Sequence, residues 1–146
     1  MSLAMTKAER EAFLAGVHVG IFSIAQEGRP PLTVPVWYMY EPGGDLRIVT
    51  ARDSRKLALI QQAMCFSLCV QDENRPYRYV SVEGKVISIE RPDLERHLRP
   101  QAWRYLGVEK GDSYIESIGG KALEDTDMVV TMRPERWLTT DYGKRE

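Results

Sequence analysis

The pattern of hydrophobic and polar positions predicts three β-strands in the first part of the chain. From Val17 to Ala25 the apolar side chains occupy both alternating sets of positions, which predicts a strand covered on both faces. Two further β-rich runs, Leu32 to Tyr40 and Leu46 to Thr50, flank the turn residues Glu41 to Asp45, which favour an antiparallel hairpin. Because Pro35 has no N–H to donate, we expect the pairing of the second run to be interrupted there.

The second half of the chain adds more strands. Met64 to Val70 is apolar with little alternation, and Tyr77 to Ile89 is a long run that contains Gly84. The alternation places Gly84 on the core face, where a glycine indicates a bulge, a bend or the close approach of another backbone. Met128 to Arg133 is predicted as a strand, and Arg136 to Thr140 as a separate strand after a turn at the intervening proline.

Capping residues mark the expected helices. Thr6 and Glu9 match a capping box, which predicts a short first helix. A second helix is predicted to open at Asp53 or Ser54. After Pro92 further helical segments are expected at residues 93–98, 101–106 and 112–118. This order of elements predicts an α+β chain built on an antiparallel barrel.

Composition restricts the class of protein. The 146 residues fit one compact domain, which we place at residues 5–146, and residues 1–4 have the form of an expression scar. The net charge is -1, whereas a non-specific nucleic-acid binder needs a basic excess, so we expect no nucleic-acid partner. No apolar run approaches the roughly 20 residues that span a bilayer, so we expect no membrane partner.

The cysteines and histidines indicate a reducing compartment and no metal. Cys65 and Cys69 are the two cysteines, and a strand through both would place them on one face, too far apart to bridge. We therefore expect buried free thiols in a cytoplasmic protein. His18 and His97 are isolated and have no metal-ligand spacing around them, so we expect no metal site.

The stretch from Arg52 to Lys56 is a candidate anion site. The first turn of a helix carries N–H groups without partners and the positive end of the helix dipole, and Arg52, Ser54, Arg55 and Lys56 can add donors. A simpler interpretation is that Asp53 caps the helix and the basic side chains are solvated.

Residues Val34 to Trp37 are a second candidate. An interrupted strand leaves space beside it, so this stretch is a plausible wall for a flat ligand. The alternative is a plain edge strand or a bulge at Pro35.

Four motifs carry a resemblance to a known family. They are Val34-Pro35-Val36-Trp37-Tyr38, Ser54-Arg55-Lys56, Pro76-Tyr77-Arg78-Tyr79-Val80 leading into Gly84, and Arg104-Tyr105-Leu106-Gly107. Together they resemble the split-barrel flavin-binding family typified by pyridoxamine phosphate oxidase, and within it the branch of deazaflavin (coenzyme F420)-dependent reductases. The resemblance implies an α+β fold, an antiparallel split β-barrel with flanking helices.

The resemblance also implies a coenzyme site. It places the coenzyme phosphate where the third strand enters the following helix, with Lys56 as its basic ligand, and the flavin or deazaflavin ring beside the strand at Pro35. The implied coenzyme-binding residues are Val34, Pro35, Val36, Trp37, Thr50, Arg52, Ser54, Arg55 and Lys56. The chain departs from the family at Leu59, where relatives often carry Asn, and at Ser81 and Glu83, where many carry an acidic and then a basic residue.

These observations predict an oxidoreductase that binds F420, or alternatively FMN, and transfers a hydride to or from a small organic substrate. No catalytic residue stands out; the hydroxyls of Tyr38, Tyr79 and Tyr105 are candidate proton donors, but such tyrosines more often pack with a satisfied hydroxyl. The alternative is a non-catalytic flavin-binding or haem-binding split-barrel protein. Because strands apolar on both faces need more cover than short helices supply, and because the resemblance places the cofactor cleft between subunits, we expect a homodimer. Tyr77 to Tyr79, or residues around Trp103, are expected to close the cleft from the partner chain.

Overall fold

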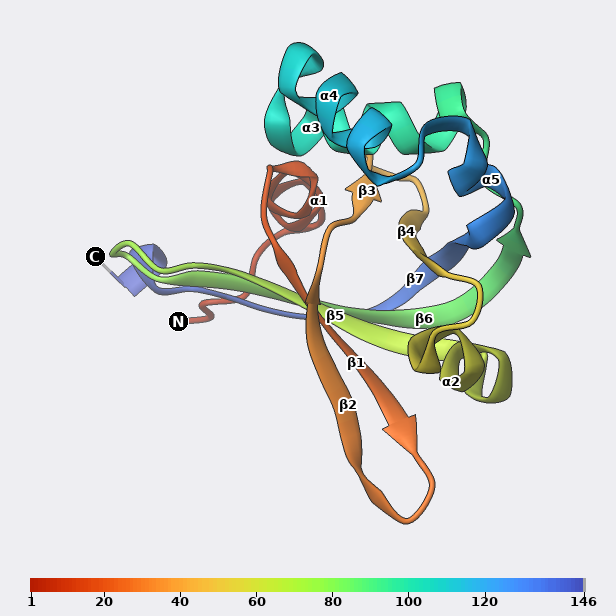
Figure 1. The fold of residues 1–146 in the computed structure, drawn as a ribbon. Coiled ribbons are helices and arrows are strands. Elements are labelled where there is room, and N and C mark those ends of the chain that lie inside the picture. Colours follow the sequence, from red (N-terminus) through yellow and green to blue (C-terminus); the bar gives the residue numbers. More distant parts are fainter. Residues whose placement is uncertain (146) are drawn as a thin grey trace.

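One antiparallel sheet runs through the molecule and curls around a hydrophobic core (Figure 1). The computed structural model describes residues 1–145. Its seven strands follow the order β2-β1-β5-β6-β7-β4-β3, so β2 and β3 are the two edges and the sheet is not closed. The strands are β1 (Gly20–Gln26), β2 (Arg29–Val36), β3 (Met39–Tyr40), β4 (Leu46–Ala51), β5 (Cys65–Asp72), β6 (Arg78–Glu90) and β7 (Asp127–Asp141). The predicted α+β split barrel is confirmed.

Helices pack against the curled sheet at the β3–β4 end and on the other side of β4. The helical elements are α1 (Lys7–Ala15), α2 (Arg55–Ala63), η1 (Leu94–Leu98), α3 (Arg99–Leu106), α4 (Val108–Ile118), η2 (Gly120–Ala122), α5 (Leu123–Thr126) and η3 (Tyr142–Arg145). The elements from η1 to α5, which we call the helical cap, lie together over the β3–β4 end of the sheet (Figure 1). Helix α2 lies at the other side of β4, and the β1–β2 hairpin projects away from both.

Two hydrophobic clusters hold these layers together. The larger lies inside the curled sheet and includes the fully buried Phe22, Ile48, Ile60 and Val80. The smaller lies under the helical cap, which packs Leu94, Leu98, Ala102, Ile115 and Leu123 against the partly buried Val49 of β4. Because side chains alternate along a strand, β4 contributes Ile48 to the first cluster and Val49 to the second. The strand β4 therefore separates the barrel interior from the space under the cap.

Several local predictions are confirmed. Thr6 and Glu9 form the capping box of α1, and Ser54 is the N-cap of α2. Gly84 lies on the core face of β6 at a bulge, where an added Cβ would lie 1.8 Å from the carbonyl oxygen of Arg133. Close backbone approach therefore explains this glycine, as the alternation indicated.

Three local predictions are wrong. Pro35 does not interrupt its strand, because β2 is an edge strand and Pro35 stays in register with Ile21 of β1; the pairing ends after Val36 instead. The predicted turn between two C-terminal strands is only a register shift within the single long strand β7. The strand predicted to begin at Val17 begins at Gly20 instead. Its outward residue Ile21 is 41% exposed in the single chain, so the expected cover of both faces, by helices or a second subunit, stays a prediction.

The cysteines and the termini complete the description. Cys65 and Cys69 are free and share one face of β5, as predicted, but Cys65 is exposed and Cys69 is half-buried, so the prediction of buried thiols is wrong. The carbonyl of Leu3 accepts a hydrogen bond of 2.8 Å from the N–H of Asp141. The assignment of residues 1–4 to an expression scar stays a prediction. Within residues 1–145, no helix combines the length and the apolar character that crossing a membrane requires.

Candidate functional site

The first turn of α2 forms a compact polar group with the end of β4. The hydroxyl oxygens of Thr50 and Ser54 lie 3.1 Å apart, and the Ser54 hydroxyl donates to the carbonyl of Ala51 at 2.7 Å. Ser54 also accepts a bond of 3.1 Å from the N–H of Leu57 and so caps the helix. The N–H groups of Arg55 and Lys56 stand in the same turn, where the helix has no carbonyl to offer them. Donors and the positive end of the helix dipole therefore converge here.

Lys56 is the charged residue of this turn that carries the anion-site hypothesis. Its side chain is half-buried, and its Nζ lies 5.9 Å from the centre of the Phe22 ring. Burial lowers the pKa of the Lys56 amine below its usual 10.5, and within residues 1–145 no carboxylate opposes this effect. A desolvated ammonium without a counter-ion favours an anionic ligand beside it.

The two arginines of this stretch are engaged elsewhere. The Arg55 guanidinium donates to the side-chain oxygen of Gln26 at the end of β1. Arg52 is exposed, its N–H donates to the Thr126 carbonyl at 2.8 Å, and its charge helps to hold down the pKa of the Asp125 carboxyl. Both arginine side chains are exposed, so Lys56 is the one basic residue of this stretch whose side chain is half-buried.

The stretch from Val34 to Trp37 is divided between different surroundings. Val36 is buried and Val34 packs against the core, while Pro35 points to the exposed side of β2. Val34 pairs with Phe22, so it lies on the sheet face that carries the ring next to Lys56. Trp37 leaves the sheet and stacks on Tyr105 of the cap, with ring centres 4.6 Å apart and planes 6° apart. The four residues thus do not form one continuous wall.

Hydrogen bonds of two tyrosines hold the chain where it crosses from β2 to β3. The Tyr105 hydroxyl accepts from the N–H of Tyr38 at 3.0 Å and donates to the carbonyl of His18 at 2.7 Å. The Tyr38 hydroxyl donates to the carbonyl of Leu14 at 2.6 Å, and burial raises the pKa of Tyr38 well above its usual 10.0. Both hydroxyls are satisfied by the backbone, so their geometry favours packing over proton donation.

Sequence reasoning missed the supporting partners of the basic residues. Phe22 lies under the Lys56 amine, and Gln26 accepts from Arg55, but both belong to a strand about 30 positions earlier in the chain. No local pattern marks such partners, because the contact arises only when α2 packs onto β1. Only a prediction of the long-range contacts between α2 and β1 could have identified them.

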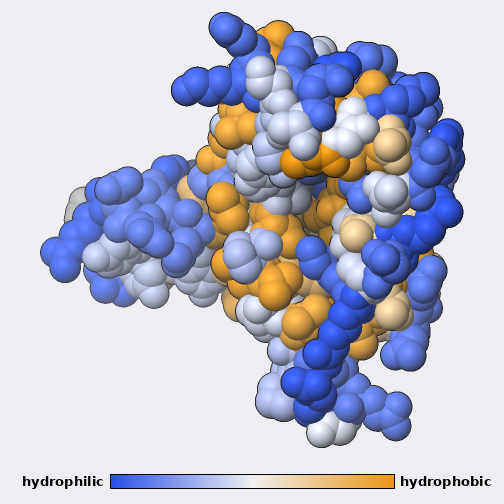
Figure 2. Space-filling model, viewed as in Figure 1, coloured by the Kyte–Doolittle hydropathy of each residue, from blue (hydrophilic) through white to orange (hydrophobic). Residues whose placement is uncertain are grey.

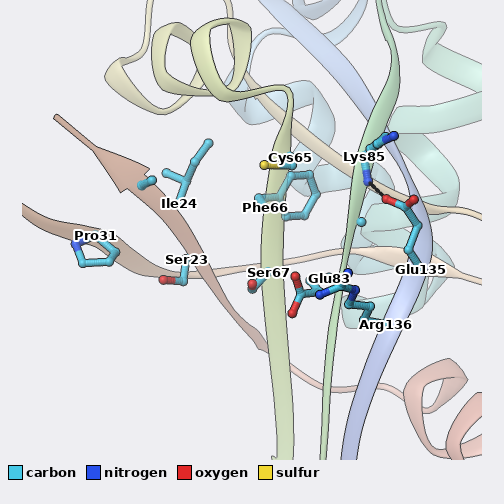
Figure 3. A pocket seen from close by; sticks show the side chains of 12 residues that line it. Ser23, Ile24, Pro31, Cys65, Phe66, Ser67, Glu83, Lys85, Glu135 and Arg136 are labelled. Carbon is cyan, nitrogen blue, oxygen red and sulfur yellow. Dashed lines mark hydrogen bonds between the residues drawn. The ribbon is translucent and has the colours of Figure 1, made fainter.

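A hollow lies on the outer face of the sheet, away from these residues. It has a volume of about 560 Å³, and Ser23, Ser67 and Glu83 lie along it on the neighbouring strands β1, β5 and β6 (Figure 3). None of the predicted coenzyme-binding residues lines it. Among residues 1–145 there is also no group of three side chains that could hold a metal ion.

Solved structures of other proteins share this fold. An F420 reductase matches with a TM-score of 0.72 and 20% identity, over 88% of this chain and 94% of that one. A Listeria innocua protein assigned to pyridoxamine 5′-phosphate oxidase matches with a TM-score of 0.66 and 12% identity, over 91% and 96%. The fold is the split barrel of the pyridoxamine 5′-phosphate oxidase-like proteins.

Other comparisons set the limits of this likeness. A FAD-binding protein from Mesorhizobium loti has the same split barrel, with a TM-score of 0.66 and 21% identity over 93% of this chain and 94% of that one. No protein-family model matches the chain, and no curated protein matches it in sequence. At these identities the likeness concerns the fold alone.

Proposed function

We propose that this protein binds a flavin-type coenzyme, F420 or FMN, and acts as an oxidoreductase that transfers a hydride to or from a small organic substrate. One observation carries the proposal: the half-buried Lys56 ammonium has no acidic partner among the described residues and stands at the first turn of α2. The backbone N–H groups of Arg55 and Lys56 in the same turn add donors, whereas the hydroxyl protons of Thr50 and Ser54 are used within the turn. This donor set suits a phosphate group.

The expected binding energy is consistent with a phosphate anchor. Two charge-assisted hydrogen bonds contribute about 1.5–3 kcal/mol each, and the helix end up to about 2 kcal/mol. These contributions make up a large part of the roughly 8 kcal/mol that corresponds to micromolar affinity. The phosphate contacts are therefore the decisive ones in this proposal.

The ring is proposed to lie against the edge strand β2, where a second copy on the outer face of the sheet would close the cleft. Val34 and Val36 face the same side as the Lys56 amine, and hydrophobic surface gathers between the helical cap and the β1–β2 hairpin (Figure 2). The hydride chemistry belongs to the coenzyme, and the protein supplies binding, orientation and exclusion of water. A protein in this role needs no side-chain proton donor, which agrees with the hydroxyls of Tyr38 and Tyr105 being bonded to the backbone. The named split-barrel neighbours, an F420 reductase and a FAD-binding protein, support a coenzyme of this type.

A homodimer with the coenzyme cleft at the subunit interface is part of the proposal. On the outer face of the sheet, register partners form one row across the strands β2, β1, β5, β6 and β7: Pro35, Ile21, Cys69, Ser81 and Leu138. Leu138 is 64% exposed, and the 560 Å³ hollow lies beside this row. A second copy is the occupant that this flat face suits, since small and apolar side chains pack closely. Sedimentation of the wild-type protein as a monomer would contradict the dimer.

The experiment that tests the function is a titration of coenzyme-free protein with F420 and with FMN, followed by fluorescence. Micromolar binding of one of them supports the proposal, and the tighter ligand identifies the coenzyme; the Pro76 to Val80 motif favours F420. Binding of neither ligand overturns the proposal. Haem absorbance in the purified protein would support the non-catalytic alternative instead.

We also propose a cytoplasmic location. Cys65 and Cys69 are both free and stand four positions apart on β5, which places them on one face beyond bridging distance. Free, accessible thiols are typical of reducing compartments. Fractionation of cells that express the protein tests this location.

A further inference from the structure

A small cavity lies between the helical cap and the outer face of the sheet. Its volume is about 140 Å³, and Trp37 and Tyr114 line it together with apolar side chains of the cap such as Leu98 and Ile115. The rings of Trp37 and Tyr114 lie 5.5 Å apart and are tilted by 53°. A cavity of this size holds roughly six non-hydrogen atoms.

Two acceptor groups stand in this aromatic surrounding. The side-chain oxygen of Gln101 is buried and has no hydrogen-bond partner among the described residues. Asp127, the first residue of β7, also lines the cavity, and burial raises the pKa of its carboxyl above the usual 3.8. The one hydrogen bond that this carboxyl accepts, from the hydroxyl of Thr126, is long at 3.5 Å. The half-buried Asp127 carboxyl thus keeps acceptor capacity for a ligand, whereas the Gln101 oxygen is fully buried and is not accessible from the cavity.

The charges around the cavity have one sign. Asp127 is the only charged residue that lines it in the described part of the chain, and no basic side chain there acts on its carboxyl. The cations of this region, Arg47 and Arg96, line a separate cavity of about 170 Å³, which shares Gln101 and Val49 with the first. The cavity of Asp127 therefore offers a carboxylate and aromatic rings, and its described lining has no positively charged side chain.

We propose that this cavity is a binding site for a small organic cation, such as a protonated primary amine on a short apolar chain. The Asp127 carboxylate accepts a hydrogen bond from the ammonium group, and Trp37 and Tyr114 line the cavity beside it and its chain. A cation is attracted to aromatic faces and gains a charge-assisted bond to the carboxylate, whereas an anion would meet an unpaired acid.

The inference goes beyond the proposed function and does not depend on it. Trp37 lines the cavity and follows directly on Val36 of β2, so an amine bound here would lie next to the proposed coenzyme site. Binding of the amine requires no coenzyme. It is therefore measured on coenzyme-free protein, where a failure of coenzyme binding cannot affect the result.

The test compares butylammonium with its neutral analogue 1-butanol at pH 7 by protein-observed NMR titration. We expect butylammonium to bind the wild-type protein roughly tenfold more tightly. In Asp127→Asn the preference is expected to fall to within about twofold, because the amide keeps the shape of the carboxylate and removes its charge. Equal affinity of the two ligands for the wild-type protein overturns the proposal.

A charge control and a second variant complete the design. Glu109→Gln removes one negative charge from the exposed surface of α4 and is expected to keep the full preference. Gln101→Leu removes a buried oxygen that the cavity does not expose, and it is expected to keep the preference for butylammonium. If Asp127→Asn folds and keeps the wild-type preference, the assignment of the cavity is wrong. The ligand comparison on the wild-type protein decides the question even where a variant fails to fold.

Discussion

The first turn of α2 and the cavity under the helical cap are electrostatic opposites. Lys56 is a half-buried cation and Asp127 a half-buried anion, and burial is the largest cause of the pKa shift at each. They are close along the sheet, since Asp127 pairs with Ala51, the last residue of β4 before the α2 turn. Neither neutralises the other. The first turn of α2 is therefore suited to an anionic ligand, and the cavity under the helical cap is suited to a cationic one.

Arg99 of the cap is a useful contrast to both. Its guanidinium contacts Glu95, Asp112 and Glu116 at 3.0 to 3.2 Å. This charge is satisfied within the fold and ties η1 and α3 to α4, so it needs no ligand to explain it. The difference shows that an uncompensated charge, and not charge alone, marks a candidate site.

The largest expected effect separates the two sites by function. Lys56→Ala is expected to weaken F420 or FMN binding about 100-fold, or about 2.7 kcal/mol, because the phosphate loses its charged donor. Butylammonium binding is expected to change less than twofold, since Lys56 does not line the cavity of Asp127. Fluorescence and NMR titrations measure the two affinities. Lys110→Ala, an exposed change on α4, serves as the control, and unchanged coenzyme affinity in Lys56→Ala would refute the phosphate assignment.

The second prediction concerns Tyr105, which holds the segment between β2 and β3 that lies next to both sites. Tyr105→Phe removes the acceptor of the Tyr38 N–H and the donor to the His18 carbonyl, so Trp37 loses its anchored neighbour. We expect a loss of about 1–3 kcal/mol in the free energy of unfolding, measured with urea, and weaker binding of both ligands. Tyr142→Phe removes a hydroxyl at an exposed position and should leave stability within about 0.5 kcal/mol. Wild-type stability of Tyr105→Phe would show that this hydroxyl does not fix the crossing.

The smallest effect is a pair of opposite pH dependences. Because the native pKa of Lys56 is depressed, its charge costs stability at pH 7, and this cost disappears as the pH rises towards 10.5. Because the native pKa of Asp127 is raised, its cost disappears as the pH falls towards 3.8. Lys56→Met and Asp127→Asn should therefore both stabilise the protein at pH 7, each by less than about 1 kcal/mol because both groups are partly solvated.

Thermal unfolding across the pH range measures these differences. The advantage of Lys56→Met is expected to shrink at alkaline pH, and that of Asp127→Asn at acidic pH. An advantage of the same size at every pH would mean that packing, and not the buried charge, causes it.

The sequence by itself determined the elements whose causes are local. The capping box at Thr6, the start of α2 at Ser54 and the core face of β6 around Gly84 follow from neighbouring residues, and each was predicted. The hydroxyl and backbone groups at the start of α2 belong to this local class as well. Candidate residues close together in the chain were therefore found.

The tertiary structure decided what depends on distant partners. It placed Pro35 at an edge, joined the C-terminal strands into β7 and separated Trp37 from Val34 and Val36. Among residues 1–145 it also gave Lys56 and Asp127 no counter-ion, which no spacing reveals, because a missing partner depends on everything packed around a group. The physical reason is range: caps and alternation act over a few residues, whereas burial and charge compensation act through space.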